Sequence, residues 1–202
     1  MTYTRYAVLR YIHTKWKISM RIKPGIYPEY FTISEVTDGM FFGQEILKRK
    51  LAVNVQDFGR HVIAFYKHNP KHITPLGYQH IAEYETVALL GGGSVDGLSF
   101  KDIPEEVCDD LRRKGGVLYL LLTHVFREYA DLYEAFFGFC GDARAEQIDL
   151  RAGFNYTGIP MLLAKYREGI SEDRKQELLD SVVKLGSNFD GIYEYNDIKK
   201  DL

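Results

Sequence analysis

The spacing of apolar residues along the chain predicts an alternation of strands and helices. Apolar and polar residues alternate from Trp16 to Ile22, which is typical of a strand. A second short strand is predicted from Tyr30 to Val36. Asp38 then has the side chain of a helix N-cap, and the apolar positions that follow it predict a helix through Leu51.

The middle of the chain has a more extended pattern. His61 to Tyr66 is rich in strand formers, and the stretch from Leu76 to Leu90 predicts either one bent strand or two strands. Because glycines often mark turns, the run Gly91–Gly93 is interpreted as the end of that stretch and a flexible turn. A helix is predicted from Asp102 to Lys114, with Pro104 in its first turn.

The second half alternates helix and strand. The predicted elements are a buried helix at 117–129, a central strand at 133–140, a helix at 143–152 capped by Asp142 and Gly153, a strand at 156–166, and a helix from Ser171 to Leu185. We therefore expect an α+β (mixed α/β) fold: a single twisted, largely antiparallel mixed sheet with helices on both faces. One domain is expected over residues 1–202, with a basic N-terminal extension at 1–28 and a polar tail at 187–202.

The overall charge narrows the range of partners. The chain has 26 Lys and Arg against 28 Asp and Glu, a formal charge of −2, so it has no general attraction to nucleic acid or to anionic membranes. The two cysteines and six histidines show no disulfide framework and no metal-ligand spacing. We expect a cytoplasmic protein with no metal, no nucleic-acid partner and no membrane segment, and we leave a homodimer open.

The glycine-rich stretch 91–97 matches none of the usual nucleotide or nucleophile motifs. It lacks the Gly-Lys-Ser/Thr ending of a P-loop and the spacing of a dinucleotide fingerprint. Ser94 is not in a nucleophile elbow, because Asp96 stands where that turn needs glycine.

A basic, glycine-containing turn precedes the buried helix that begins at Val117. Its residues are Arg112, Arg113, Lys114, Gly115 and Gly116. A turn of this kind exposes backbone N–H groups at a helix N-terminus, where they can bind a pyrophosphate. The alternative is an ordinary helix end with basic residues that complement the helix dipole.

Two motifs in this half of the chain resemble the GNAT superfamily of acyl-CoA-dependent N-acyltransferases. The first is Arg112-x-x-Gly115-Gly116-Val117, and the second is Asp142-x-x-Ala145-x-x-x-Asp149-x-x-x-Gly153-Phe154. The likeness covers about residues 61–166 and follows the family's order of loop, helix, strand, helix and strand. It implies a GNAT-like fold that binds acetyl-CoA through residues 112–117, Asp142 and Ala145. It also implies that an amine attacks the thioester directly, without a covalent enzyme intermediate.

Three residues depart from the family pattern. Val117 stands where Gly or Ala is usual, Asp142 replaces Asn, and Asp149 replaces a Tyr that protonates the departing thiolate. We expect Asp149 to have a pKa near 4, so that it is an anion that would repel a thiolate. Two outcomes are open: its side chain turns away to pair with Arg144 or Arg151 and leaves protonation to water or to a nearby tyrosine such as Tyr156, or the site has lost its chemistry and the protein only binds.

Glu83 and Glu85 are the candidate general bases. They lie two residues apart on an extended stretch, so they are expected to share one face and to raise each other's pKa. The alternative is a solvated outer face of an edge strand.

The expected function is transfer of an acetyl group from acetyl-CoA to an amine on a small molecule or a protein. A fold relative that binds CoA or another ligand without catalysis, and an interaction module, remain the alternatives. The sequence does not identify the acceptor.

Overall fold

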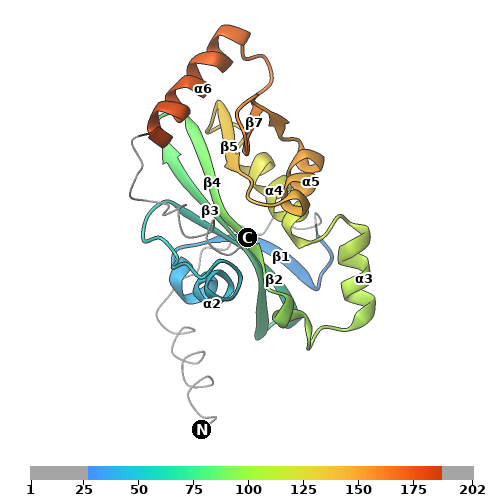
Figure 1. Cartoon of the computed structure of the whole chain (residues 1–202). Coiled ribbons are helices and arrows are strands. Elements are labelled where there is room, and N and C mark those ends of the chain that lie inside the picture. The colour runs from blue at the N-terminus through green and yellow to red at the C-terminus, as the bar shows by residue number, and fades with distance from the viewer. Residues whose placement is uncertain (1–26, 188–202) are drawn as a thin grey trace.

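The computed structural model describes residues 27–187, which form a seven-stranded sheet with helices on both faces (Figure 1). The pairing of β4 with β5 is parallel, and the other neighbouring pairs in this sheet are antiparallel. The predicted fold class is confirmed. Across the sheet the strands are β1 (Phe31–Val36), β2 (Arg60–Asn69), β3 (His72–Tyr84), β4 (Val87–Val95), β5 (Ala135–Phe139), β7 (Leu162–Tyr166) and β6 (Asn155–Tyr156).

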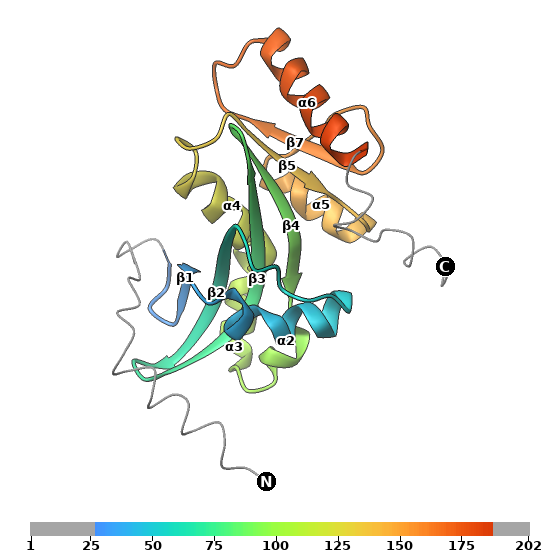
Figure 2. The same ribbon diagram turned by 90° about the vertical axis from the view of Figure 1, so that its left-hand side faces the viewer.

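The helices form two layers around the sheet (Figure 2). One face carries α2 (Gly39–Leu51) and α6 (Glu172–Ser187), and the other carries α3 (Glu105–Arg113), α4 (Val117–Glu128) and α5 (Ala143–Ala152). The largest apolar core lies under α4, and a short 3-10 helix, η1 (Gly97–Phe100), joins β4 to α3. None of the helices within residues 27–187 is both long and apolar enough to cross a membrane.

Local capping explains why the helix predictions hold. Asp38 accepts the backbone N–H of Phe41 at 2.8 Å and starts α2. Asp142 accepts two backbone N–H groups at the start of α5, and Gly153 ends that helix in the left-handed region at φ +111°. Each cap satisfies backbone groups that have no partner inside the helix.

Two strand predictions are wrong. Gly91–Gly93 is not a turn after a strand but lies inside β4, where Gly91 pairs with His80 of β3. The predicted strand at 156–166 is a hairpin of β6 and β7, broken where Gly158 and Met161 adopt φ values of +86° and +67°. The strand at Trp16–Ile22, the extension up to residue 26 and the tail after residue 187 lie outside the described residues.

The sheet opens into a fork between β4 and β5. These strands pair only from Val87 with Ala135 to Leu90 with Gly138, although β4 continues to Val95. We call the paired stretch the closed end and Gly91–Val95 the open limb. A register shift in the β3–β4 pairing lies in this limb, where the Gln79 amide donates to the Gly91 carbonyl at 3.1 Å. A bulge of this kind bends one strand away from its neighbour.

Candidate active site

The N-terminus of α4 has the geometry of an anion site. Gly115 and Gly116 adopt left-handed φ values of +106° and +88°, which glycine tolerates and other residues rarely adopt. The first helical hydrogen bond after them runs from Leu120 N–H to Gly116 O at 3.0 Å. The N–H groups of residues 117–119 precede it and have no acceptor of their own within the helix.

The two glycines have different surroundings. A Cβ on Gly115 would lie 2.4 Å from the Tyr119 ring, whereas a Cβ on Gly116 would meet nothing within 4 Å. Val117, where the family usually has Gly or Ala, is only 4% exposed. Its side chain is therefore in the core, so the space in front of the helix N-terminus is left to Gly116.

The basic side chains of this loop already have acidic partners. Arg112 binds Asp109 at 2.5 Å, while Arg113 and Lys114 bind Asp110 at 3.4 and 2.5 Å. Lys114 and the Tyr30 hydroxyl lower the pKa of Asp110 to about 2. A bound anion would thus depend first on the backbone N–H groups, and on the side chains only if they exchange partners.

Asp149 is on α5, and its side chain faces Cys140, the residue that follows β5. Burial raises the pKa of Asp149 to about 6, and its carboxylate is hydrogen-bonded to the Cys140 thiol. One expectation about this residue is wrong. Its pKa is not near 4, because α5 packs it against the sheet. Arg151 is held by the Gly115 carbonyl at 2.6 Å and by the Tyr119 ring at 5.0 Å, so it is not its partner.

The other predicted residues at this end of β5 have different roles. The Asp142 carboxylate accepts the N–H of Ala145 at 2.8 Å, so these two groups are used in the α5 cap. Tyr156 is 67% exposed and lies near Cys140. A hydrogen bond to the Glu146 carboxylate raises the pKa of Tyr156, so the phenol keeps its proton at neutral pH.

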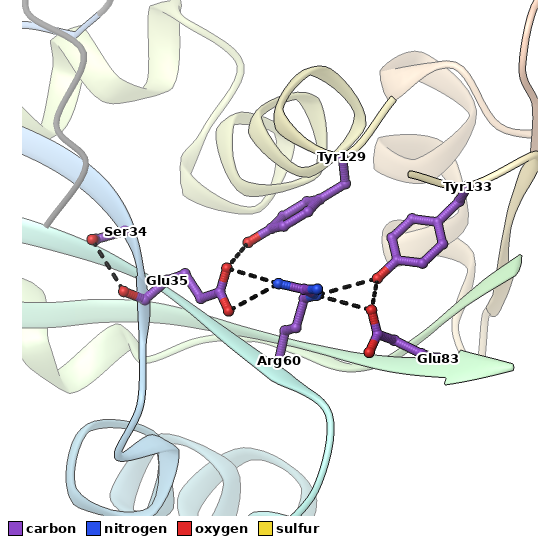
Figure 3. Close-up of polar contacts among 6 residues, drawn as sticks. All are labelled: Ser34, Glu35, Arg60, Glu83, Tyr129 and Tyr133. Carbon is purple, nitrogen blue, oxygen red and sulfur yellow. Dashed lines mark hydrogen bonds and ion pairs between the residues drawn. The ribbon is translucent and has the colours of Figure 1, made fainter. Parts of the chain in front are cut away.

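The structure separates the two glutamates proposed as bases. Glu83 is on β3, whereas Glu85 lies in the β3–β4 turn at φ +50°, so the two do not share a strand face. The Tyr133 hydroxyl and the Arg60 guanidinium donate to Glu83 and lower its pKa, opposite to the expected direction (Figure 3). Glu83 also faces Ala88 at the closed end, three residues and roughly 10 Å from the open limb.

Figure 3 shows the network that holds Glu83. Arg60 lies between Glu83, at 3.0 Å, and Glu35, at 3.2 Å. The Tyr129 hydroxyl, just after α4, donates to Glu35 at 2.7 Å. This arrangement ties the C-terminal end of α4 to three strands, which is a structural role.

One polar cluster beside the fork has no counterpart among the sequence predictions. His61, Tyr78 and His80 lie buried between the sheet and α2, and Tyr78 and His80 pair with residues of the open limb. The available signal was the i, i+2 spacing of Tyr78 and His80, which puts both on one strand face. Among the described residues, no group of three or more His, Cys, Asp or Glu side chains could hold a metal ion.

No protein-family model and no curated protein sequence matches the chain. The solved structures that resemble it include acetyltransferases. A proposed acetyltransferase from Pyrococcus horikoshii has a TM-score of 0.46 at 13% identity, over 66% of this chain and 46% of that one. The ribosomal-protein-S18-alanine N-acetyltransferase of Escherichia coli has a TM-score of 0.49 at 17% identity, over 71% of this chain and 97% of that one.

A third solved structure is the N-acetylglutamate synthase of Neisseria gonorrhoeae, complexed with coenzyme A and L-arginine. It has a TM-score of 0.46 at 12% identity, over 69% of this chain and 34% of that one. These likenesses concern the fold alone. The order of loop, helix, strand, helix and strand is the order predicted from the sequence, and the fork lies between β4 and β5.

Proposed function

We propose that the protein is an acyl-CoA-dependent N-acyltransferase that moves an acetyl group from acetyl-CoA to an amine. The observation that supports it best is the fork in the sheet, next to a helix N-terminus that begins with two left-handed glycines. An elongated thioester ligand needs a slot for its chain and a site for its phosphates, and these two features lie side by side.

The residues present fit such a ligand. The N–H groups of residues 117–119 would bind the pyrophosphate, with Gly116 leaving room for it. Gly93, in the open limb, is exposed and has no side chain to fill the slot. When bound, acetyl-CoA supplies a thioester carbon: a bond from nitrogen to carbon forms, the carbon–sulfur bond breaks, nitrogen loses a proton and sulfur gains one.

We assign the sulfur's proton to Tyr156. Its phenol keeps its proton at neutral pH and lies near Cys140, where the fork ends on the β5 side. Asp149, with a pKa of about 6, is mostly ionised at neutral pH and would repel a thiolate.

A second candidate is a protein that binds CoA without turnover. The acidic surroundings of Cys140 favour it: Asp142 and Asp149 add to the raised pKa of the Cys140 thiol, and a departing thiolate would be repelled there in the same way. Calorimetry with CoA and acetyl-CoA, followed by a thiol-release assay with a panel of amines, separates the two. Binding with amine-dependent thiol release supports the transferase, and binding alone supports the second candidate. Absence of binding contradicts both.

A further inference from the structure

The buried rings beside the open limb form one polar cluster. His61 Nδ1 lies 2.8 Å from the Tyr78 hydroxyl, and the His61 ring stacks on His80 with centroids 5.4 Å apart. His61 is 6%, His80 3% and Tyr78 0% exposed. Burying a polar group costs free energy unless it is hydrogen-bonded, and apolar side chains could pack here without that cost.

Three glycines make room for the three rings. A Cβ on Gly39 would lie 2.2 Å from His61, and one on Gly43 would lie 2.4 Å from Tyr78. At Gly59, with φ +76°, a Cβ would lie 2.4 Å from the Ile81 carbonyl oxygen and 2.8 Å from His80 Nε2, so both the backbone and the ring require glycine there. A glycine inside a helix, such as Gly43, costs roughly 0.5–1 kcal/mol relative to alanine. The backbone is therefore built around these rings.

The cluster lines the open limb of the fork. His80 pairs with Gly91, the first residue of β4 beyond the closed end, and Tyr78 pairs with Ser94. Directly paired residues share a face of the sheet, so Ser94 faces the cluster. Its hydroxyl is the one buried side-chain oxygen or nitrogen that lacks a partner within residues 27–187. An unsatisfied buried hydroxyl is where a polar ligand or a water is expected.

The hydrogen bonds fix the chemistry of His80. Its Nε2 lies 2.7 Å from the Phe58 carbonyl, which can only accept, so Nε2 carries the proton and the neutral ring keeps its lone pair on Nδ1. Burial lowers the pKa of His80, and burial together with His80 lowers that of His61, against smaller opposing effects of Asp38 and Glu35. Both rings are therefore neutral at neutral pH, the state that can accept a proton.

We propose that His80 accepts the proton of the attacking amine and that His61 and Tyr78 position it. The proposal rests on the proposed acyltransferase function. As the amine nitrogen bonds to the thioester carbon and the carbon–sulfur bond breaks, the nitrogen's proton passes through one water beside Gly91 to Nδ1 of His80. The imidazolium then releases it to solvent, while the sulfur takes its proton from Tyr156, which is reprotonated by solvent.

This assignment takes the place of Glu83 and Glu85 as bases. Glu83 is bound by Arg60 and Tyr133 at the closed end, and Glu85 lies in a turn. His80, in contrast, pairs with the limb along which the substrate chain would lie.

The test is His80→Gln, because a glutamine amide can still donate to the Phe58 carbonyl but has no titratable lone pair. The matched control is His68→Gln near the β2–β3 hairpin, where His68 bonds Thr74 and stacks on His72. Thiol release from acetyl-CoA is followed against pH with whichever aliphatic amine or free peptide N-terminus the wild type acetylates. For His80→Gln we expect the rate of thiol release to fall about a hundredfold or more, the rise of the rate with pH on the acidic side to flatten, and the CoA affinity to stay unchanged. For His68→Gln we expect no change in any of the three.

An NMR titration of His80 in the wild type gives a readout independent of turnover and of how the variant folds. We expect a pKa below 6.5 and a shift of the ring signals when CoA is added. The proposal is overturned if His80 is a cation at neutral pH, or if His80→Gln keeps both its rate and the rise of that rate with pH. It is also overturned if Glu83→Gln, and not His80→Gln, abolishes the rise of the rate with pH. CoA binding by the wild type without turnover of any amine would overturn the transferase itself, and this inference with it.

Discussion

The two ends of the fork use polar residues in opposite ways. At the closed end, Arg60 faces two carboxylates and the tyrosine hydroxyls complete their hydrogen bonds. At the open limb, within residues 27–187, the neutral rings of His61 and His80 form no ion pair and the Ser94 hydroxyl has no hydrogen-bond partner. On α5, beside the fork, burial raises the pKa of Asp149.

This difference suggests a structural role for the charged network at the closed end and a functional role for the neutral cluster at the open limb. Matched charges hold elements together, whereas buried polar groups without a countercharge are candidates for a functional site. Helix α4 connects the two ends: its 12 residues span roughly 18 Å between Gly116 and Tyr129. The closed end therefore anchors the helix whose other end would bind the ligand.

The largest expected effect is on stability at the closed end. Arg60→Met would leave Glu35 and Glu83 without their shared cation, and it would also remove a hydrogen bond to Tyr133 and a contact with the Tyr129 ring. Because water still solvates both carboxylates, the free energy of unfolding should fall by roughly 2 kcal/mol. Urea denaturation measures it. Lys175→Met is the control: it removes a pair with the exposed Glu172 and a cation–π contact with the Tyr166 ring, and should change stability by about 1 kcal/mol or less. Equal effects of the two variants would show that the network does not anchor the sheet.

The next prediction is a gain of stability, from a substitution at Asp149 beside the fork. Because the folded pKa of Asp149 is about 6 against an ordinary 3.8, the folded state binds more protons between these values, so stability falls as pH rises from about 4 to 6. Asp149→Asn removes this penalty. The variant should be more stable than wild type by roughly 2 kcal/mol near pH 7.5 and equal to it near pH 4. Asp131→Asn, on an exposed turn, is the control, and a stability difference that is the same at both pH values would contradict the assignment.

A substitution in the glycine turn before α4 should reduce CoA affinity more than it reduces stability. Gly116→Val places a side chain in front of the α4 N–H groups and should weaken CoA binding by about tenfold or more, measured by calorimetry. Gly169→Val has a similar φ of +80° and equally open surroundings, but it lies before α6. Both variants should lose roughly 1–2 kcal/mol of stability, with CoA affinity reduced only at Gly116. Gly115 is a poorer test, because a Cβ there would collide with Tyr119.

The sequence was informative where local chemistry decides the structure. Asp38, Asp142 and Gly153 each act through their own few residues, so the ends of α2 and α5 could be predicted. The glycines of β4 could not, because their extended, bulged backbone depends on pairing with a strand that begins 19 residues earlier, at His72.

The same reasoning explains what was missed at the site. The motif around Arg112–Val117 is contiguous and was visible in the sequence. The pKa of Glu83 is lowered by Tyr133 and Arg60, and that of Asp149 is raised by its burial. Both effects come from residues that are distant in sequence or on another element. Two carboxylates spaced by two residues reveal neither the turn that separates them nor the arginine that neutralises one of them.

The central claim is that a CoA ligand lies along the open limb and against the start of α4. A titration of ¹⁵N-labelled protein with CoA, followed by amide NMR shifts, tests it directly. We predict that the largest shifts fall on Gly91–Val95 and on residues 116–119, while Arg60, Glu83 and Tyr133 at the closed end stay unchanged. Shifts confined to the closed end, or no shifts at saturating CoA, would contradict the account.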